Sequence, residues 1–166
     1  MKWSILQIST AFAIIAIMAV LEFQTGYRTM EPTTGQWTPV YSAYVTFFII
    51  ALVISCFYFL FLFEAKKEKS LFSRKMWGNM PKKVLIVGAL SAVLFIALGA
   101  TGMVFEWVEE WRFLLYIFLV YFLFLIYVFI FSFEHKMKKF AKPYEKTAFI
   151  SYIWTLLLFF ILFVFF

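Results

Sequence analysis

The sequence contains few of the residues that most often bind metals or carry out catalysis. Aspartate is absent, and cysteine, histidine and asparagine each occur once among the 166 residues. Because Cys56 is the only cysteine, the chain has no internal disulfide and offers no cysteine pair to a metal. Because His135 is the only histidine, bis-histidine haem ligation and multi-histidine metal sites are excluded within one chain. We therefore expect no cofactor and no metal site.

Charged residues are also scarce, while hydrophobic residues make up most of the chain. Charged residues account for 14% of the sequence, against about 25% in a soluble domain. Hydrophobic residues account for 65%, phenylalanine alone contributes 25 residues, and the mean hydropathy is +0.93. A water-soluble domain of this size cannot bury so much apolar surface. The composition predicts an all-α integral membrane protein.

Five segments are long and apolar enough to cross a bilayer, which requires about 20 residues per helix. They lie near residues 4–22, 41–63, 84–104, 113–133 and 148–166. Nothing of length remains for a soluble domain, so we expect residues 1–166 to form one transmembrane helical domain. The first segment could be a signal peptide, but it is long and has no clear cleavage site before Glu22. We expect it to be retained as a helix.

The basic residues predict the orientation of the chain in the membrane. Of the 15 lysines and arginines, only Arg28 and Arg112 fall in the connections after the first and third spans. The others cluster at residues 66–83 and 136–146 and at Lys2. Because basic residues are enriched in cytoplasmic loops, we expect a cytoplasmic N-terminus and an outer C-terminus. We expect a multi-pass protein of a bacterial plasma membrane.

The same basic loops predict contacts with anionic lipid headgroups. A basic residue near an anionic membrane surface contributes about 1 kcal/mol to binding. Topology therefore explains the net charge of +6, and no nucleic-acid partner is expected. The candidate lipid contacts are Lys66, Lys67, Lys69, Arg74, Lys75, Lys136, Lys138 and Lys139.

The loop between the second and third spans has a pattern of its own. Phe72, Met76 and Met80 recur every four residues beside basic side chains. This spacing predicts a short amphipathic helix that lies in the headgroup plane and ends at Pro81. A helix that docks onto a partner protein would have the same pattern.

Two similar endings suggest an internal repeat. The stretch "FEAKKEK" at 63–69 is followed, seventy residues later, by "FEHKMKK" at 133–139. The preceding helices match more weakly, so the chain reads as two tandem helical hairpins followed by a C-terminal helix. The alternative is coincidence between common membrane residues. His135 corresponds to Ala65, so we interpret the histidine as an interfacial residue of the basic loop.

Small residues favour close helix packing, because they let two backbones approach each other in lipid. The third span carries five of them on one face, and the first span carries a weaker version. The fourth span and the second half of the fifth are bulky, which suits contact with lipid or with a larger partner. We therefore expect the first and third spans at the centre of the fold. The candidate packing residues are Gly88, Ser91, Ala92, Gly99 and Gly102.

Carboxylates gather in the predicted outer connections. One hypothesis is a shallow acidic site for a hard cation or for a basic protein surface. The alternative is an ordinary membrane boundary, with Trp107 and Trp111 as interfacial anchors and Arg112 paired with a neighbouring glutamate. The longer connection at 24–42 is expected to be an interfacial loop. The alternative is a cap over the outer helix ends that shapes a ligand site or contacts a partner. The candidate acidic cluster is Glu22, Glu106, Glu109 and Glu110.

No ionisable residue lies at the centre of a predicted span, which argues against a proton relay, a voltage sensor or ion-coupled transport by a single chain. The nucleophile-elbow, zinc-protease and phosphate-loop motifs are also missing. We expect a non-catalytic accessory or structural subunit that associates with another membrane protein or with copies of itself. The alternative is a small oligomeric transporter or channel for a hydrophobic or lipidic solute, with a cavity between the first and third helices.

Overall fold

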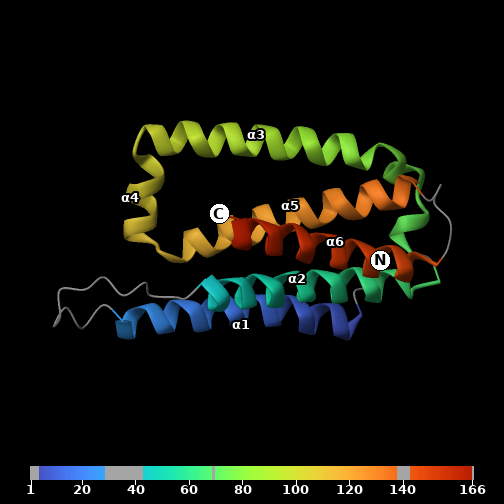
Figure 1. Cartoon of the computed structure of the whole chain (residues 1–166), viewed down its shortest axis with the longest axis horizontal. Helices are drawn as coiled ribbons and strands as arrows, with labels where there is room; N and C mark the ends of the chain where they lie inside the picture. Colours follow the sequence, from blue (N-terminus) through green and yellow to red (C-terminus); the bar gives the residue numbers. More distant parts are fainter. Residues whose placement is uncertain (1–3, 29–42, 69, 138–142, 166) are drawn as a thin grey trace.

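The computed structural model describes residues 4–28, 43–68, 70–137 and 143–165, and this part of the chain contains helices and no strands (Figure 1). Five of the helices are long and apolar enough to cross a membrane, so the predicted number of spans is confirmed. The predicted outer connection lies largely outside the described residues. The elements are α1 (Ile5–Arg28), α2 (Ala43–Ala65), η1 (Leu71–Ser73), η2 (Lys75–Asn79), α3 (Met80–Ala100), α4 (Met103–Glu110), α5 (Phe113–Met137) and α6 (Tyr144–Phe165), where η denotes a 3-10 helix.

The third span differs from its prediction at both ends. Pro81 stands in the first turn of α3 and begins this helix, because proline lacks the N–H that the first turn leaves unpaired. At the other end Gly102 has a φ of 83°, a left-handed conformation that favours glycine. The chain therefore turns at Gly102, and residues 103–110 form the separate helix α4, which runs across the end of the bundle (Figure 1).

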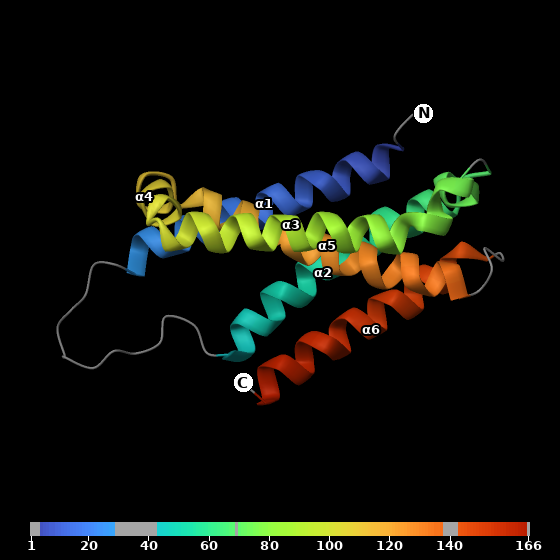
Figure 2. The same cartoon turned by 90° about the horizontal axis from the view of Figure 1, so that it is seen from above.

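Helices α2 and α5 form the centre of the bundle. α2 packs against α1, α5 and α6, and α5 also packs against α3 and α6. Figure 2 shows α1 and α6 on either side of this pair. Ile54 of α2 and Tyr127 of α5 are fully buried in the shared core. The prediction that the first and third spans form the centre is wrong, and the bulky fourth span is a core helix.

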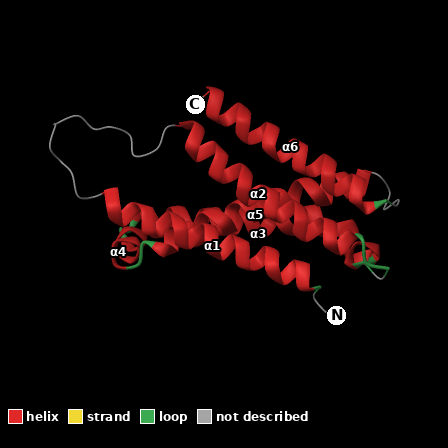
Figure 3. Ribbon diagram, turned by 90° about the horizontal axis from the view of Figure 1, so that it is seen from below, coloured by secondary structure: helices red, strands yellow, loops and turns green. Residues whose placement is uncertain are grey.

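The closest packing face of α6 lies in its first half. Thr147, Ala148, Ser151 and Thr155 are fully buried there, where α6 meets α2 and α5 (Figure 3). The hydroxyl of Ser151 donates to the backbone carbonyl of Thr147 at 2.8 Å. The hydroxyl of Thr155 donates to the backbone carbonyl of Ser151 at 2.7 Å. Small side chains let the backbones approach. Bonds within the helix satisfy the hydroxyls of Ser151 and Thr155, whereas the buried hydroxyl of Thr147 has no hydrogen-bond partner among the described residues.

A larger side chain on this face of α6 should push the helix away from α2 and α5. We expect Ser151→Leu to lower the free energy of unfolding by about 2 kcal/mol, because a packed core resists added methylenes. Ser151→Ala removes only a hydroxyl that bonds within its own helix, so its effect should stay within about 0.5 kcal/mol. Unfolding by SDS titration, followed by circular dichroism, measures both. Equal stability of the two variants would contradict this packing.

Among the small residues of α3, Ser91 contacts α5, whereas Gly88 and Gly99 meet no neighbour in the described part of the chain. The hydroxyls of Ser91 and Tyr121 are 2.7 Å apart, and the ring of Phe95 packs against α5. A Cβ atom placed on Gly88 or Gly99, however, would meet nothing within 4 Å. These glycines mediate no close helix contact within the chain, and contact with a second chain through them stays a prediction.

Two glycines at one end of α3 should therefore respond to substitution in opposite ways. Gly99→Ala should stabilise the protein by up to about 0.5–1 kcal/mol, because alanine favours the helical backbone of this last turn and the site has room. Gly102→Ala should destabilise it by about 1–2 kcal/mol, because the left-handed backbone strains a residue with a Cβ. Thermal unfolding in one detergent tests the pair. Destabilisation by Gly99→Ala would show that a neighbour covers this glycine in solution.

Candidate functional site at the basic end of the bundle

The basic end is the end where α1, α3 and α6 begin and where α2 and α5 finish, on the right of Figure 1. A hydrogen-bond network joins three elements there. The carboxylate of Glu64, which is 5% exposed, accepts hydrogen bonds from the amide of Gln7 at 3.1 Å and from the backbone N–H of Leu71 at 3.0 Å. The ammonium of Lys67 donates to Glu64 at 2.6 Å and to the amide oxygen of Gln7 at 2.7 Å. Glu64 thus ties α1, α2 and η1 together.

His135 lies in the last turn of α5 and is fully buried, so its interpretation as an interfacial loop residue is wrong. Its Nε2 atom is 3.0 Å from the carbonyl oxygen of Phe72. A carbonyl only accepts hydrogen bonds, so Nε2 carries the proton and donates it. The imidazole also stacks on Phe131, with ring centroids 5.8 Å apart and planes 9° apart. The histidine anchors the connection between α2 and α3 to α5.

The connection itself folds onto the helix ends. It contains the 3-10 helices η1 and η2, so the predicted amphipathic α-helix is wrong, and Pro81 begins α3 instead of ending a helix. Phe72 is 2% exposed, whereas Met76 is 59% exposed. Phe72 inserts into the bundle because it buries more apolar area among helix ends than at a membrane surface. The surrounding rings are those of Phe61, Trp77, Phe131, His135 and Tyr144.

A cleft opens between α1 and α3, which lie on opposite sides of α5 in Figure 1. Its volume is about 340 Å³, and α2 and α5 form its floor. The Glu64 network closes the cleft at the basic end. Apolar side chains line it from there to the middle of α5. We call this site the α1–α3 cleft, and its defining residues are Gln7, Leu60, Glu64, Lys67, Phe124 and Val128.

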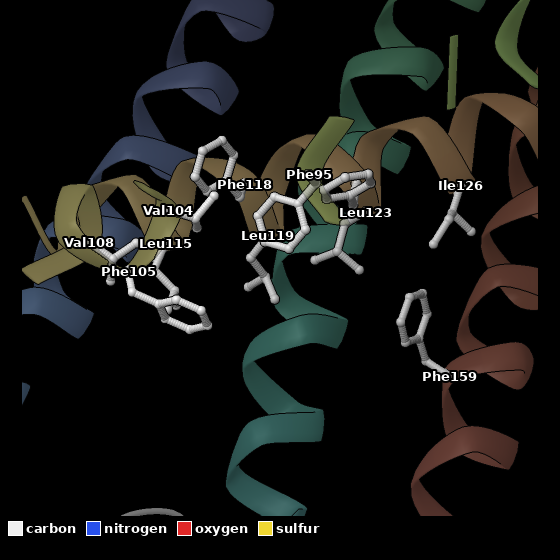
Figure 4. Close-up of a pocket in the computed structure, with 11 residues that line it drawn as sticks. Phe95, Val104, Phe105, Val108, Leu115, Phe118, Leu119, Leu123, Ile126 and Phe159 are labelled. Atoms are coloured by element: carbon white, nitrogen blue, oxygen red, sulfur yellow. The ribbon is translucent and has the colours of Figure 1, made fainter. Parts of the chain in front are cut away.

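A second cavity lies at the other end of the bundle, beneath α4. Its volume is about 410 Å³, and every residue that lines it is apolar (Figure 4). Val104 and Phe105 contribute one wall, Phe95 of α3 a second, and Phe159 of α6 a third. Such a cavity can hold hydrocarbon, but it offers no group for hydrogen bonding or catalysis.

The predicted acidic cluster does not form a metal site in the described part of the chain, where no three acidic, histidine or cysteine side chains come together. Glu106, Glu109 and Glu110 are exposed on α4, and Glu22 is half-buried on α1. The predicted pairing of Arg112 with a neighbouring glutamate is also not found among the described residues. Both predicted anchors on this side, Trp107 and Trp111, are exposed.

The candidate lipid contacts separate into different environments. Lys66, Arg74 and Lys136 are exposed and can reach a headgroup. Lys67 belongs to the Glu64 network, which lowers its availability. Lys75 begins η2, and the remaining candidates, Lys69, Lys138 and Lys139, lie outside the described residues. Sequence reasoning did not single out Gln7, whose role depends on a partner 57 residues away.

Comparison with known proteins assigns no family to this arrangement. No family model matches the chain, and no curated protein or solved structure matches it significantly. The function is therefore argued from the geometry of the described residues.

Proposed function

We propose that this protein is a non-catalytic subunit of a larger membrane complex and that a partner's transmembrane helix packs into the α1–α3 cleft. The cleft carries the proposal. It is a concave surface whose lining from α2, α5 and the α2–α3 connection is largely apolar, with Gln7, Glu64 and Lys67 at its polar end.

The two helices that border the cleft are the least covered of the bundle. Only 6% of the apolar span of α3 and 11% of that of α1 is buried inside the protein, against 33% for α2. A single lipid-facing helix surface is ordinary in a membrane, but here two such helices border one cleft, to which α1 contributes Gln7 and α3 contributes Met80. Helices in lipid associate by surface complementarity of this kind.

The polar end of the cleft favours a protein over a lipid tail. Gln7 is buried and bonded within the Glu64 network, but the ammonium of Lys67 is partly exposed and can approach a polar residue of a partner helix. Hydrogen bonds between transmembrane helices contribute roughly 1 kcal/mol each. An acyl chain offers this ammonium no such partner.

The polar residues of the basic end are already engaged in structural bonds, which supports a non-catalytic role. Glu64 accepts three hydrogen bonds, and His135 donates its Nε2 proton to a carbonyl in the protein interior. A general base must lie within reach of a substrate. His135 is fully buried and Glu64 is nearly so, and both side chains hold the helix ends together.

Site-specific photocrosslinking in the native membrane tests the proposal. A photoreactive phenylalanine analogue at Phe124, in the cleft, should form a stoichiometric adduct with one integral membrane protein. The same analogue at Phe48, which is exposed on α2 outside the cleft, should not. Leu60→Trp, which fills the cleft, should abolish the adduct, and Leu52→Trp on the same helix should leave it. Adducts with lipid alone would overturn the proposal.

The second candidate is a small oligomeric transporter for a lipidic solute. The apolar cavity beneath α4 favours it, because this cavity and the α1–α3 cleft offer hydrocarbon-sized spaces at both ends of the bundle. A crosslink at Phe124 to a second copy of the chain, together with lipid translocation by the purified protein in vesicles, would support this candidate over the first.

A further inference from the structure

A groove separate from the α1–α3 cleft lies between the start of α3 and the end of α5. Its volume is about 610 Å³, and it shares no lining residue with the cleft. Leu85 and Ile86 of α3 form one wall, and Phe129 and Phe133 of α5 form the other. Lys82 and Lys136 stand at its basic end, one on each helix. The groove therefore combines an apolar trough with two cations at its mouth.

The mouth of the groove has an uncompensated positive charge. Lys82 and Lys136 are exposed, and neither forms an ion pair with another described residue. The first turn of α3 has no acidic residue, and Asn79 provides no side-chain cap. No acidic side chain of this turn therefore offsets the two ammonium groups, which line the same groove.

Two phenylalanine rings of α5 separate this groove from a second one. Phe129 and Phe133 stack with centroids 6.4 Å apart and also line a groove of about 730 Å³ between α5 and α6. Trp154 and Leu158 form the far wall of that groove. Glu134 lies beside it and disfavours a second phosphate there. The two apolar grooves therefore lie side by side, and a headgroup bound between Lys82 and Lys136 is next to both.

We propose that these paired grooves bind one anionic diacyl phospholipid. Its phosphate lies between Lys82 and Lys136, one acyl chain follows the α3–α5 groove, and the other follows the α5–α6 groove. A free phosphate would use the charges and leave the apolar walls uncovered. Both grooves lie between helices that are long enough to span a membrane. Acyl chains of the bilayer therefore surround them. It is independent of the α1–α3 cleft, so either proposal can fail alone.

Lipid retention by the full-length protein tests the headgroup site. Purified protein is incubated with palmitoyl-oleoyl phosphatidylglycerol or phosphatidylcholine, and bound lipid is counted by native mass spectrometry. We expect preferential retention of phosphatidylglycerol. Because one basic residue changes lipid affinity about fivefold, Lys82→Ala with Lys136→Ala should weaken phosphatidylglycerol binding about 25-fold. Lys83→Ala with Lys146→Ala removes the same charge from exposed positions that line neither groove and should change it little.

A second pair of variants tests the apolar trough without changing charge. Leu85→Trp fills the α3–α5 groove and should reduce phosphatidylglycerol retention, whereas Ile96→Trp, at an exposed position on α3 away from the grooves, should not. Equal losses in both lysine pairs would mean diffuse surface attraction and overturn the site. Equal retention of the two lipids, or competition by inorganic phosphate as effective as by phosphatidylglycerol, would overturn it as well.

Discussion

Phe72→Ala is expected to lower the free energy of unfolding by about 3–5 kcal/mol, the range for truncating a large aromatic side chain in a packed core. The ring centroids of Phe131, Trp77 and Phe61 lie 4.6, 5.0 and 5.5 Å from that of Phe72. Truncation leaves a cavity among these rings. It also loosens the connection whose carbonyl accepts the hydrogen bond of His135. The loss should therefore exceed that of any other substitution proposed here.

The matched control for this prediction lies in the same connection. Met76→Ala removes a side chain that is largely exposed, so it should change stability by no more than about 0.5 kcal/mol. SDS titration followed by circular dichroism compares both variants with the unaltered protein. Hydrogen exchange at residues 70–79 should accelerate in Phe72→Ala alone. A cost below about 1 kcal/mol would mean that Phe72 is not buried in solution.

Glu64→Leu should produce the second largest loss, about 3 kcal/mol, because breaking a buried ion pair leaves its partner groups unsatisfied. The substitution removes the acceptor for Gln7, Lys67 and the N–H of Leu71 at once. Lys67 is partly exposed and regains some hydration, so the loss should fall at the lower end of the range for fully buried pairs.

Glu64→Gln is the matched variant, because it keeps one oxygen acceptor and the side-chain length but loses the negative charge. It should cost about 1–2 kcal/mol, clearly less than Glu64→Leu. The two values come from the same SDS titration. If Gln7→Leu restored stability to the Glu64→Leu protein, the cost would be confirmed as one of unsatisfied polar groups. A fully stable Glu64→Leu protein would contradict the network.

The contrast between α3 and α6 shows why small residues alone do not predict close packing. The sequence singled out the small residues of α3, yet Gly88 and Gly99 have empty space beside them. The face of α6 formed by Thr147, Ser151 and Thr155 was not singled out, and it is fully buried. Small residues permit a close approach, but the remaining contacts of both helices decide whether it occurs.

His135 and Glu64 show the same limit for the candidate site. The sequence marked both as parts of a repeated ending and assigned them to a membrane boundary. Their partners, Phe72 and Gln7, lie 63 and 57 residues away along the chain. No local pattern encodes such pairings. Lys136, in contrast, is exposed, because charged side chains seek water wherever the fold permits, and its contact with lipid stays a prediction.

The sequence by itself determined that the chain is an all-helical protein with five membrane-length helices, and it placed them to within a few residues. A chain in lipid must form its backbone hydrogen bonds within each segment, so a spanning segment is a helix. A hydrophobic run of about 20 residues marks where each such helix lies. Only the tertiary structure decided that α2 and α5 are central, that Phe72 closes the basic end, and which grooves remain open. Nearly every face of these helices is apolar, so hydropathy cannot distinguish a neighbour from lipid, and shape makes that choice.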